Sequence, residues 1–314
     1  MNDMPRDGMT ISVIVCTYNR SESLSVTLKS LADSIVPEVV TWELLVVDNN
    51  SNDSTRAVVE AFAAAQNFPV RYVFERRQGV SFARNTGTSQ ARGKLIAFTD
   101  DDVMVDPMWI AAVREAFERF QCVGLGGRVL PLWGQAQPKW FNSAGPFRLV
   151  GAIVEFDRGD VPIRLDWPAI GANMAFRRDI FDRYGGLRTD LGPSGDRHMV
   201  GDDSEFFMRM MNAGEELMYA PQAIVYHPVP PARVRKSYFR AWYFQHGMAS
   251  AKLNANQLPK DVRRYWGIPR YLFRQCAVGA ARWLFCRGSA KRFYYQLQAC
   301  RALGEISEFH RSRG

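Results

Sequence analysis

Apolar and polar residues alternate in blocks along the first hundred positions, and the blocks have the lengths of strands and helices. Four of the blocks are short apolar runs of the kind found in buried parallel strands. The three blocks between them have helical length and lie next to capping or turn residues. We therefore expect strands at 11–16, 42–47, 70–74 and 95–99 and helices at 22–31, 55–65 and 82–90.

This alternation of strand and helix predicts right-handed crossovers and a mostly parallel sheet. In open sheets of this class, ligands bind beyond the carboxyl ends of the strands. No Gly-rich phosphate loop follows the first strand, which argues against a dehydrogenase or a P-loop enzyme. Polar clusters follow three of the strands and are expected to meet at one edge of the sheet: 17–19, 48–50 and 100–102.

The last of these clusters is a run of three carboxylates, Asp100, Asp101 and Asp102, directly after an apolar strand. Neighbouring carboxylates repel one another and raise the pKa of each, so a cation among them makes the cluster easier to tolerate. Taken alone, the run is equally consistent with a solvated acidic turn before the helix that begins near Asp106. At the ligand-binding edge of a sheet, we favour a divalent cation that holds a phosphorylated ligand.

The second half of the chain is less regular. Trp133 and Trp140 lie in a segment rich in Trp, Gly and Pro, at 131–146, where aromatic rings either stack on sugars or form a local core. The sequence favours neither interpretation. Around this segment we expect strands at 122–130, 170–176 and 217–226 and helices at 179–184 and 202–212.

With 314 residues, 47% of them apolar and 23% charged, the chain has an ordinary globular composition and can bury a sizeable core. Its five cysteines contain no CxxC pair, which is typical of a reducing compartment and argues against a disulfide framework or a structural zinc site. Residues 1–9 are polar, without the apolar run of a secretory signal, and no apolar run approaches the roughly 20 residues that span a bilayer. We expect a cytoplasmic protein, or one held peripherally on the cytoplasmic face of the inner membrane.

The net charge of +8 is unevenly distributed, because residues 232–314 contain 17 Lys and Arg against 3 Asp and Glu. This basic C-terminal region suits partners rich in phosphate, such as anionic lipids, lipid-linked diphosphates or nucleic acid. The alternative is a solvated helical surface rich in arginine. The region contains no RNA-binding motif, and we expect no nucleic-acid partner.

Within this region, apolar and small residues recur at helical spacing. Such a stripe predicts a helix that packs on the body of the protein. The flanking arginines are also typical of a helix that lies in a membrane interface, so peripheral membrane contact through this region is a second interpretation. The stripe consists of Tyr265, Ile268, Leu272, Cys276, Gly279, Trp283 and Cys286.

Six motifs in order along the chain resemble those of glycosyltransferase family 2, and together they cover roughly residues 10–230. The resemblance implies an α/β fold of the GT-A type, with a Rossmann-like, mostly parallel sheet flanked by helices. It also implies inversion at the anomeric carbon of the transferred sugar. The motifs are VCTYNR at 15–20, VVDNNSND at 46–53, GVSFARNTG at 79–87, TDDD at 99–102, GANMAF at 171–176 and GDDSE at 201–205.

The resemblance also implies a division of the chain. Residues 1–231 would form the GT-A catalytic domain, with a nucleotide-binding half at 10–102 and an acceptor-binding half at 103–231. Residues 232–314 would form a helical, basic C-terminal extension.

The family resemblance implies that several residues of the nucleotide-binding half contact the nucleotide-sugar donor. Asp48 would contact the nucleobase, with Thr17 and Tyr18 beside it. The Tyr18 ring can stack on a base, and the Asn19 amide can hydrogen-bond to it. Arg84 lies one turn into a helix, where its guanidinium can face phosphate.

The acidic triplet matches the Asp-x-Asp pair of the family through Asp100 and Asp102. The resemblance implies that Asp102 binds Mg²⁺ or Mn²⁺, and that Asp100 faces the donor ribose or shares the metal. Asp101 occupies the variable middle position at the nucleotide site. His227 follows the last strand, where such enzymes often supply another metal ligand, and its alternative is a structural histidine.

The second acidic motif of the family is usually Glu-Asp and is here Asp202-Asp203. The match assigns the catalytic base to Asp203, with Asp202 as the fallback and Glu205 as a weaker candidate. These acids also suit a helix N-terminus, whose dipole stabilises negative charge. Both interpretations hold together, since the dipole helps to keep a base ionised near neutral pH.

These assignments predict a metal-dependent glycosyltransferase that moves a sugar from a nucleotide-sugar, by default a UDP-sugar, to an acceptor hydroxyl. The acceptor is expected to be a glycan or lipid-linked glycan in cell-envelope or extracellular polysaccharide synthesis. A sugar-phosphate nucleotidyltransferase is the first alternative, but it typically opens with a Gly-rich phosphate loop and a lysine, both absent after Cys16. A non-catalytic nucleotide-sugar-binding module is the second alternative, and it would not need Asp203.

Overall fold

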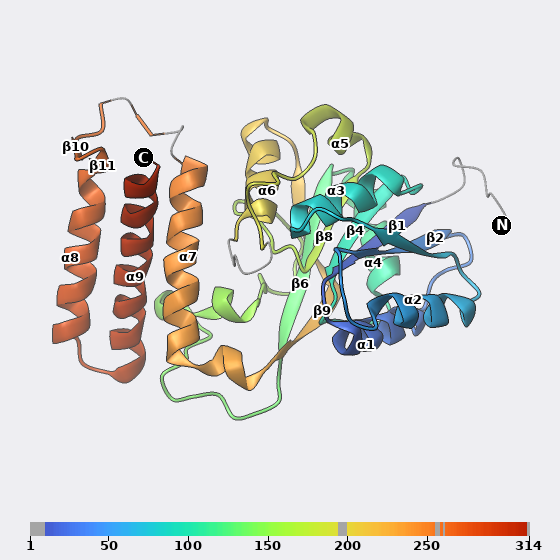
Figure 1. The fold of residues 1–314 in the computed structure, drawn as a ribbon, viewed down its shortest axis with the longest axis horizontal. Helices are drawn as coiled ribbons and strands as arrows, with labels where there is room; N and C mark the ends of the chain where they lie inside the picture. The colour runs from blue at the N-terminus through green and yellow to red at the C-terminus, as the bar shows by residue number, and fades with distance from the viewer. Residues whose placement is uncertain (1–9, 194–199, 255–257, 260, 313–314) are drawn as a thin grey trace. The chain divides into compact units, whose positions relative to one another are not determined.

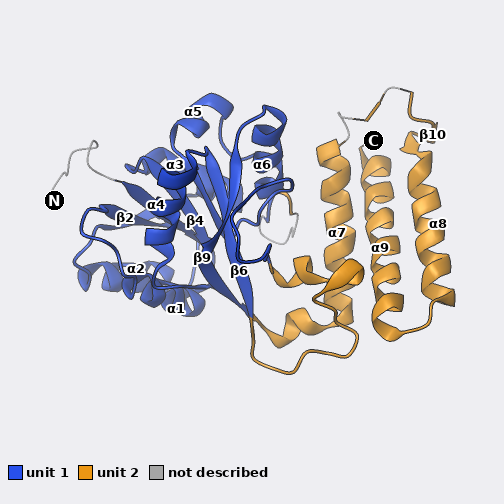
Figure 2. Ribbon diagram, turned by 180° about the vertical axis from the view of Figure 1, so that it is seen from behind, with its two compact units in different colours: residues 1–131, 156–195, 202–228 blue, residues 132–155, 196–201, 229–314 orange. Residues whose placement is uncertain are grey.

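The computed structural model describes residues 10–193, 200–254, 258, 259 and 261–312. Residues 1–9, in which the sequence predicts no secretory signal, lie outside the described residues. The chain divides into two compact units, coloured separately in Figure 2: unit 1 comprises 1–131, 156–195 and 202–228, and unit 2 comprises 132–155, 196–201 and 229–314. The division at 228 lies close to the boundary expected at 231. In contrast, the segment 132–155, expected in the acceptor-binding half, belongs to unit 2.

Unit 1 begins with the alternation that the sequence predicts. Each of the seven expected strands and helices in this part is present, with ends that differ by only one or two residues. They are β1 (Ile11–Thr17), α1 (Ser21–Ala32), β2 (Trp42–Asp48), α2 (Thr55–Ala64), β3 (Val70–Phe74), α3 (Val80–Gln90) and β4 (Leu95–Asp100).

Helices cover both faces of this half of the sheet, which is why β1 and β2 are apolar and buried along most of their length. α1 and α2 lie on one face and α3 on the opposite face (Figure 1). Right-handed crossovers produce this arrangement, because the chain steps from β1 to β2 to β3 in one direction and then returns past β1 to β4.

The second half of unit 1 adds antiparallel strands to the sheet. β8 pairs antiparallel with both β4 and β6, and the strand order is β3-β2-β1-β4-β8-β6-β9-β5, with β7 beside β9. The expected helices at 179–184 and 202–212 are confirmed. The further elements are β5 (Met104–Val105), α4 (Trp109–Phe120), β6 (Gly124–Trp133), β7 (Ile163–Arg164), β8 (Asn173–Arg177), α5 (Asp179–Tyr184), α6 (Asp202–Asn212) and β9 (Leu217–Val229).

Parallel pairing brings the carboxyl ends of β2 and β4 to the two sides of β1. Thr17 at the end of β1 is opposite Asp48 of β2, and Cys16 is opposite Asp100 of β4. The polar residues that follow these strands therefore lie at one edge of the sheet, as the sequence predicts.

Unit 2 is helical in its described part, with α9 between α7 and α8 (Figure 2). None of the helices in the described part of the chain is both long and apolar enough to cross a membrane. The elements of this unit are the 3-10 turns η1 (Gly145–Phe147), η2 (Val150–Ile153) and η3 (Pro231–Val234), the helices α7 (Lys236–Asn254), α8 (Arg270–Phe285) and α9 (Ser289–Arg311), and the short strands β10 (Arg264–Tyr265) and β11 (Ile268–Pro269).

The helix expected from Tyr265 onward begins later than the pattern indicated. Residues 264–269 form a two-stranded hairpin, whose turn holds Trp266 and Gly267 at positive φ, and α8 starts at Arg270. The apolar stripe of α8 packs on α9, where a Cβ at Gly279 would lie 3.3 Å from that of Ala299. The stripe is thus covered by α9, a helix of the same unit. Helical spacing alone does not specify which element covers such a stripe.

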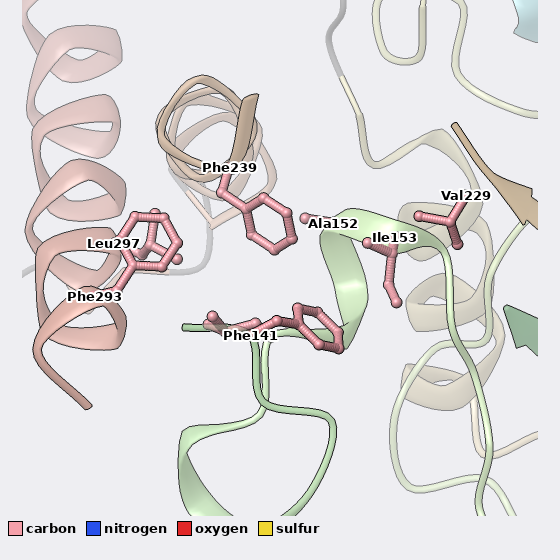
Figure 3. Close-up of a cluster of buried hydrophobic side chains, with 8 residues drawn as sticks. Phe141, Ala152, Ile153, Val229, Phe239, Phe293 and Leu297 are labelled. Carbon is pink, nitrogen blue, oxygen red and sulfur yellow. The ribbon is translucent and has the colours of Figure 1, made fainter. Parts of the chain in front are cut away.

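A separate hydrophobic core lies within unit 2, between the segment 132–155 and the helices α7 and α9 (Figure 3). The Trp140 ring packs edge-on at 4.8 Å from the ring of Phe293 and at 5.2 Å from that of Phe239. Trp133 packs in the same way at 5.1 Å from Phe141. The local-core interpretation of both tryptophans is therefore confirmed.

Two glycines set how closely α7 and α9 approach each other. A Cβ at Gly304 of α9 would overlap the carbonyl oxygen of Phe244, and a Cβ at Gly247 of α7 would overlap that of Arg301. Since the obstacle is backbone in both cases, one helix would have to move away from the other.

We expect Gly304→Ala to destabilise unit 2. In a helix, alanine is more stable than glycine by roughly 0.5–1 kcal/mol. Overpacking against a fixed carbonyl costs about 1–3 kcal/mol, so we expect the variant to be less stable than the wild type. Urea unfolding followed by circular dichroism measures it. Gly134→Ala is the control, because a Cβ there meets nothing within 4 Å. Equal stability of the two variants would contradict the close packing.

Candidate active site

The acidic edge of the sheet brings together three of the residues predicted as metal ligands. Asp100 and Asp102 lie at and beyond the end of β4, and His227 lies near the end of β9. One ligand atom from each side chain lies within 4.8 Å of those from the other two. The His227 Nε2 atom is 3.4 Å from Oδ1 of Asp102.

The donor set of two carboxylates and one imidazole fits a divalent cation such as Mg²⁺ or Mn²⁺. The Pro228 carbonyl accepts a 2.9 Å hydrogen bond from Nδ1 of His227, so in the neutral ring Nε2 carries the lone pair toward Asp102. Burial and repulsion from Asp102 raise the pKa of Asp100, against the opposing effect of Arg84. A cation between these groups would relieve that electrostatic cost.

Asp101 points to a different partner. Its side chain is buried, and its Oδ1 atom is 3.1 Å from Nη1 of Arg20, which also lies 3.2 Å from Oδ2 of Asp102. Burial raises the pKa of Asp101 to about 6, although Arg20 acts in the opposite direction. The middle carboxylate is therefore held by an arginine from the loop after β1, while its role at the nucleotide stays a prediction.

Asp48, predicted to contact the base, is buried at the end of β2. Its Oδ2 atom accepts a 2.7 Å hydrogen bond from the Tyr72 hydroxyl, and its Oδ1 atom accepts one of 2.8 Å from the Ser51 backbone. Burial and the hydrogen bond to Asp48 raise the pKa of Tyr72, so its hydroxyl keeps its proton and donates. These contacts fix the Asp48 carboxylate beside the loop that follows β1.

That loop contains the other predicted nucleoside residues. Thr17 is buried, whereas the Tyr18 side chain is 40% exposed and accessible for stacking on a base. Asn19 has a positive φ, and its Oδ1 atom accepts a hydrogen bond from the Asn52 backbone at 2.8 Å. Asn19 thus joins the loops after β1 and β2, and its side-chain amide nitrogen can still donate a hydrogen bond to a base.

Arg84 of α3 links the acidic edge to the start of α6. Its Nη1 atom lies 2.7 Å from Oδ2 of Asp202, and its Nη2 atom lies 3.4 Å from Oδ1 of Asp100. Burial alone would lower the pKa of Arg84, but the two carboxylates raise it, so the side chain is a fixed positive charge. The predicted role at the donor phosphates stays a prediction; the described contacts of the guanidinium are with carboxylates.

We expect Arg84→Met to destabilise unit 1 by about 3–5 kcal/mol, because removing one partner of a buried ion pair leaves the other charge uncompensated. The Asp202 carboxylate, 3% exposed, would be the one affected most. Chemical denaturation measures the loss. Arg56→Met is the control, since Arg56 forms a surface ion pair with Glu60 and should change stability little. Similar losses in both variants would argue against a buried ion pair.

Asp203, the predicted base, differs from its neighbour in its surroundings. Asp202 is buried in the ion pair with Arg84, whereas Asp203 is half-buried, and its partners among the described residues are backbone amides and Ser204. Oδ2 of Asp203 accepts a 2.7 Å hydrogen bond from the Gly171 amide, and Oδ1 accepts one of 2.6 Å from the Ser204 amide. Glu205 is paired with Arg209.

Loss of contact with water and repulsion from Asp202 raise the pKa of Asp203 to about 6. A carboxylate with this pKa is ionised at neutral pH and is a stronger base than an ordinary aspartate. Of the three acids considered from the sequence, Asp203 alone combines partial exposure with freedom from an arginine partner among the described residues.

Three contributors to the site were not singled out from the sequence. Tyr72 lies in β3, and only the strand register that places it opposite Val46 shows that it reaches Asp48. Arg20 belongs to the first motif, but its pairing with the acidic triplet spans 81 positions along the chain. The amide of Gly171 orients Asp203, a backbone contribution that residue type does not signal.

The comparisons with known proteins agree with this geometry. The model of the family described as Glycosyl transferase family 2 matches residues 12–185. The succinoglycan biosynthesis protein ExoM of Rhizobium meliloti is 30% identical over 305 residues, which cover 97% of this chain and 94% of that protein. A glucosyl-dolichyl phosphate glucuronosyltransferase of Haloferax volcanii is 32% identical over 226 residues, 70% of this chain and 69% of that protein. The chain belongs to glycosyltransferase family 2, as its motifs predict.

Solved structures confirm the expected GT-A fold. A mannosyltransferase from Pyrobaculum calidifontis, in complex with GDP-Man and Mn²⁺, has a TM-score of 0.62 at 18% identity, covering 95% of this chain and 86% of that one. Residues 1–349 of S. aureus TarS, in complex with UDP, have a TM-score of 0.52 at 16% identity, covering 98% and 92%. The protein is therefore a glycosyltransferase built on the GT-A sheet.

Proposed function

We propose that this glycosyltransferase moves a sugar from a nucleotide-sugar to an acceptor hydroxyl, with inversion at the anomeric carbon and with Mg²⁺ or Mn²⁺ as cofactor. One observation supports this proposal above the others. Arg84 contacts both Asp100 of the candidate metal cluster and Asp202, the neighbour of the candidate base. Arg84 thereby connects the candidate metal cluster, which would serve the donor, with the helix start that carries the candidate base for the acceptor.

The proposed reaction is a single displacement. Asp203 accepts the proton of the acceptor hydroxyl while the acceptor oxygen attacks the anomeric carbon. The bond from that carbon to the diphosphate oxygen breaks, and the nucleoside diphosphate leaves with the electron pair. When bound at Asp100, Asp102 and His227, the divalent cation supplies positive charge to the leaving diphosphate. Attack on the face opposite the leaving group inverts the configuration.

We propose UDP as the nucleotide of the donor. The family resemblance supports uridine, and Asp48 with Tyr18 offers a carboxylate and an exposed ring for a base. The related structures carry UDP in one case and GDP-Man in another. The donor experiment below therefore includes both nucleotides.

For the acceptor, we propose a glycan or lipid-linked glycan in polysaccharide or glycolipid synthesis. The names of two relatives support this class. One is a succinoglycan biosynthesis protein, and the other is a glucosyl-dolichyl phosphate glucuronosyltransferase. We also propose that the protein is cytoplasmic, or held peripherally on the cytoplasmic face of the inner membrane. Five free thiols and the basic residues of 232–314 are compatible with this location.

A panel of UDP-, GDP- and dTDP-sugars tests the proposal. Donor hydrolysis and binding are measured for each with Mg²⁺, with Mn²⁺ and without metal. We expect one nucleotide class to bind in a metal-dependent manner and to release its nucleoside diphosphate. If no nucleotide-sugar binds with either metal, the proposed function is wrong.

A further inference from the structure

A cavity whose lining residues all belong to unit 2 lies outside the candidate active site. It has a volume of about 670 Å³. The start of α7, the end of α8 and the start of α9 contribute its walls, together with the turn that joins α8 to α9. The residues that matter for its chemistry are Lys236, Arg240, Trp283, Arg287, Ser289 and Arg292.

The cavity is lined by four cationic side chains and by no acidic one. Lys236 and Arg240 come from α7, Arg287 from the turn, and Arg292 from α9. Within the described part of the chain, no carboxylate forms an ion pair with any of the four. Their charge is thus uncompensated, which favours an anionic ligand of more than one negative charge.

Local contacts hold two of these cations in place. Nε of Arg292 donates a 3.0 Å hydrogen bond to the Trp283 carbonyl, which leaves its terminal nitrogens for another acceptor. The Lys236 ammonium lies 5.3 Å from the centre of the Phe293 ring and 5.9 Å from that of Trp140. Side chains fixed before a ligand arrives lose less entropy when they bind it.

The first turn of α9 adds to the positive potential. Gly288 precedes this helix with a φ of +94°, a conformation that glycine adopts without strain, and no side chain caps the helix start. The first backbone N–H groups of α9 are therefore not bound by a capping side chain. In this setting they strengthen the preference of the four cations for phosphate.

Two large apolar side chains next to the cavity indicate where the anion comes from. Leu284 and Phe285 end α8 directly before the turn, and they are 59% and 85% exposed. Exposed apolar side chains beside arginines are typical of a segment that enters a membrane interface, where cations meet headgroup phosphates. A soluble anion would make no use of Leu284 and Phe285.

We propose that this cavity binds the phosphate groups of a membrane-embedded polyprenyl carrier, with Leu284 and Phe285 in the interface. The inference rests on the proposed function in one respect, since it takes the lipid-linked acceptor as the ligand. Binding to the carrier is nevertheless separable from catalysis, because every cavity residue lies outside the candidate active site.

The test uses the full chain and phosphatidylcholine vesicles that contain a small fraction of polyprenyl diphosphate. Sedimentation compares them with vesicles of equal charge made with phosphatidylglycerol. Arg240→Gln/Arg287→Gln should weaken binding to the polyprenyl vesicles by about tenfold or more. The control is Arg274→Gln/Arg311→Gln, which removes the same charge from exposed positions outside the cavity and should change binding by less than about twofold. Inorganic pyrophosphate should compete with the vesicles for the wild type.

A second pair of variants distinguishes a lipid ligand from a soluble anion. Phe285→Ser should weaken vesicle binding but not pyrophosphate binding, whereas Val278→Ser, at a less exposed position of α8, should affect neither. Equal losses in the cavity and control variants would overturn the proposal, as would equal binding to both vesicle types. Tighter binding of an RNA oligonucleotide than of the polyprenyl vesicles would also overturn it. Donor hydrolysis, measured in parallel, tests the proposed function by itself.

Discussion

Replacing Asp203 with asparagine is expected to lower sugar transfer by about 10²–10⁴-fold, the usual contribution of a general base. Asparagine keeps the size of the side chain, and its carbonyl oxygen can still accept the hydrogen bond that Gly171 donates. Its amide nitrogen cannot accept the second hydrogen bond, which the Ser204 amide donates to Asp203, and the variant can no longer take a proton from the acceptor hydroxyl. The measurement is kcat/KM for transfer, together with donor affinity, which should be nearly unchanged.

The control for this variant is Glu205→Gln on the same helix, because Glu205 is tied to Arg209 and takes no part in the proposed reaction. Its transfer rate should stay close to that of the wild type. Full transfer activity of Asp203→Asn would remove Asp203 as the base and favour Asp202. A loss of folded protein by circular dichroism would require the rate to be corrected for the folded fraction.

The pH dependence of the wild type follows from the same carboxylate. Burial and Asp202 raise the pKa of Asp203 to about 6, so the side chain is protonated below this pH and cannot act as a base. We expect kcat/KM to fall as the pH decreases through about 6 and to reach a plateau above it. The residual activity of Asp203→Asn should lack this step. An identical step in wild type and variant would assign the titration to another group.

Loss of one metal ligand is expected to have the second largest effect. Asp102→Asn removes a negative charge from the cluster of Asp100, Asp102 and His227, so the Mn²⁺ or Mg²⁺ concentration for half-maximal activity should rise by about tenfold or more. EDTA should abolish donor hydrolysis by the wild type, and added metal should restore it. Isothermal titration with Mn²⁺ alone provides a readout independent of activity.

Asp166→Asn is a suitable control for the metal experiment, because Asp166 forms an exposed ion pair with Arg158. It removes the same charge from unit 1 and should leave the metal requirement unchanged. His227→Gln should raise the requirement as Asp102→Asn does. Activity that resists EDTA, with an unchanged metal requirement in Asp102→Asn, would show that the cluster does not hold the cofactor.

Sequence reasoning located the parallel half of the sheet because its signals are local. Strands buried on both faces are continuous apolar runs, and the register of β1 with its neighbours then places Asp48 and Asp100 at one edge. The same reasoning placed the start of α8 too early. Helical spacing continues through Tyr265 and Ile268, whereas the positive φ at Trp266 and Gly267 forms a hairpin there.

The chain's sequence determined the order of strands and helices in unit 1, the clustering of acids at strand ends and the family to which the protein belongs. Each of these depends on residues close together along the chain. Only the tertiary structure decided that Arg84 pairs with Asp202, that Asp203 has no arginine partner among the described residues, and that α9 covers the stripe of α8. Those outcomes depend on contacts between segments that are distant along the chain. Several residues of the same type could make each contact, and only the three-dimensional arrangement selects one of them.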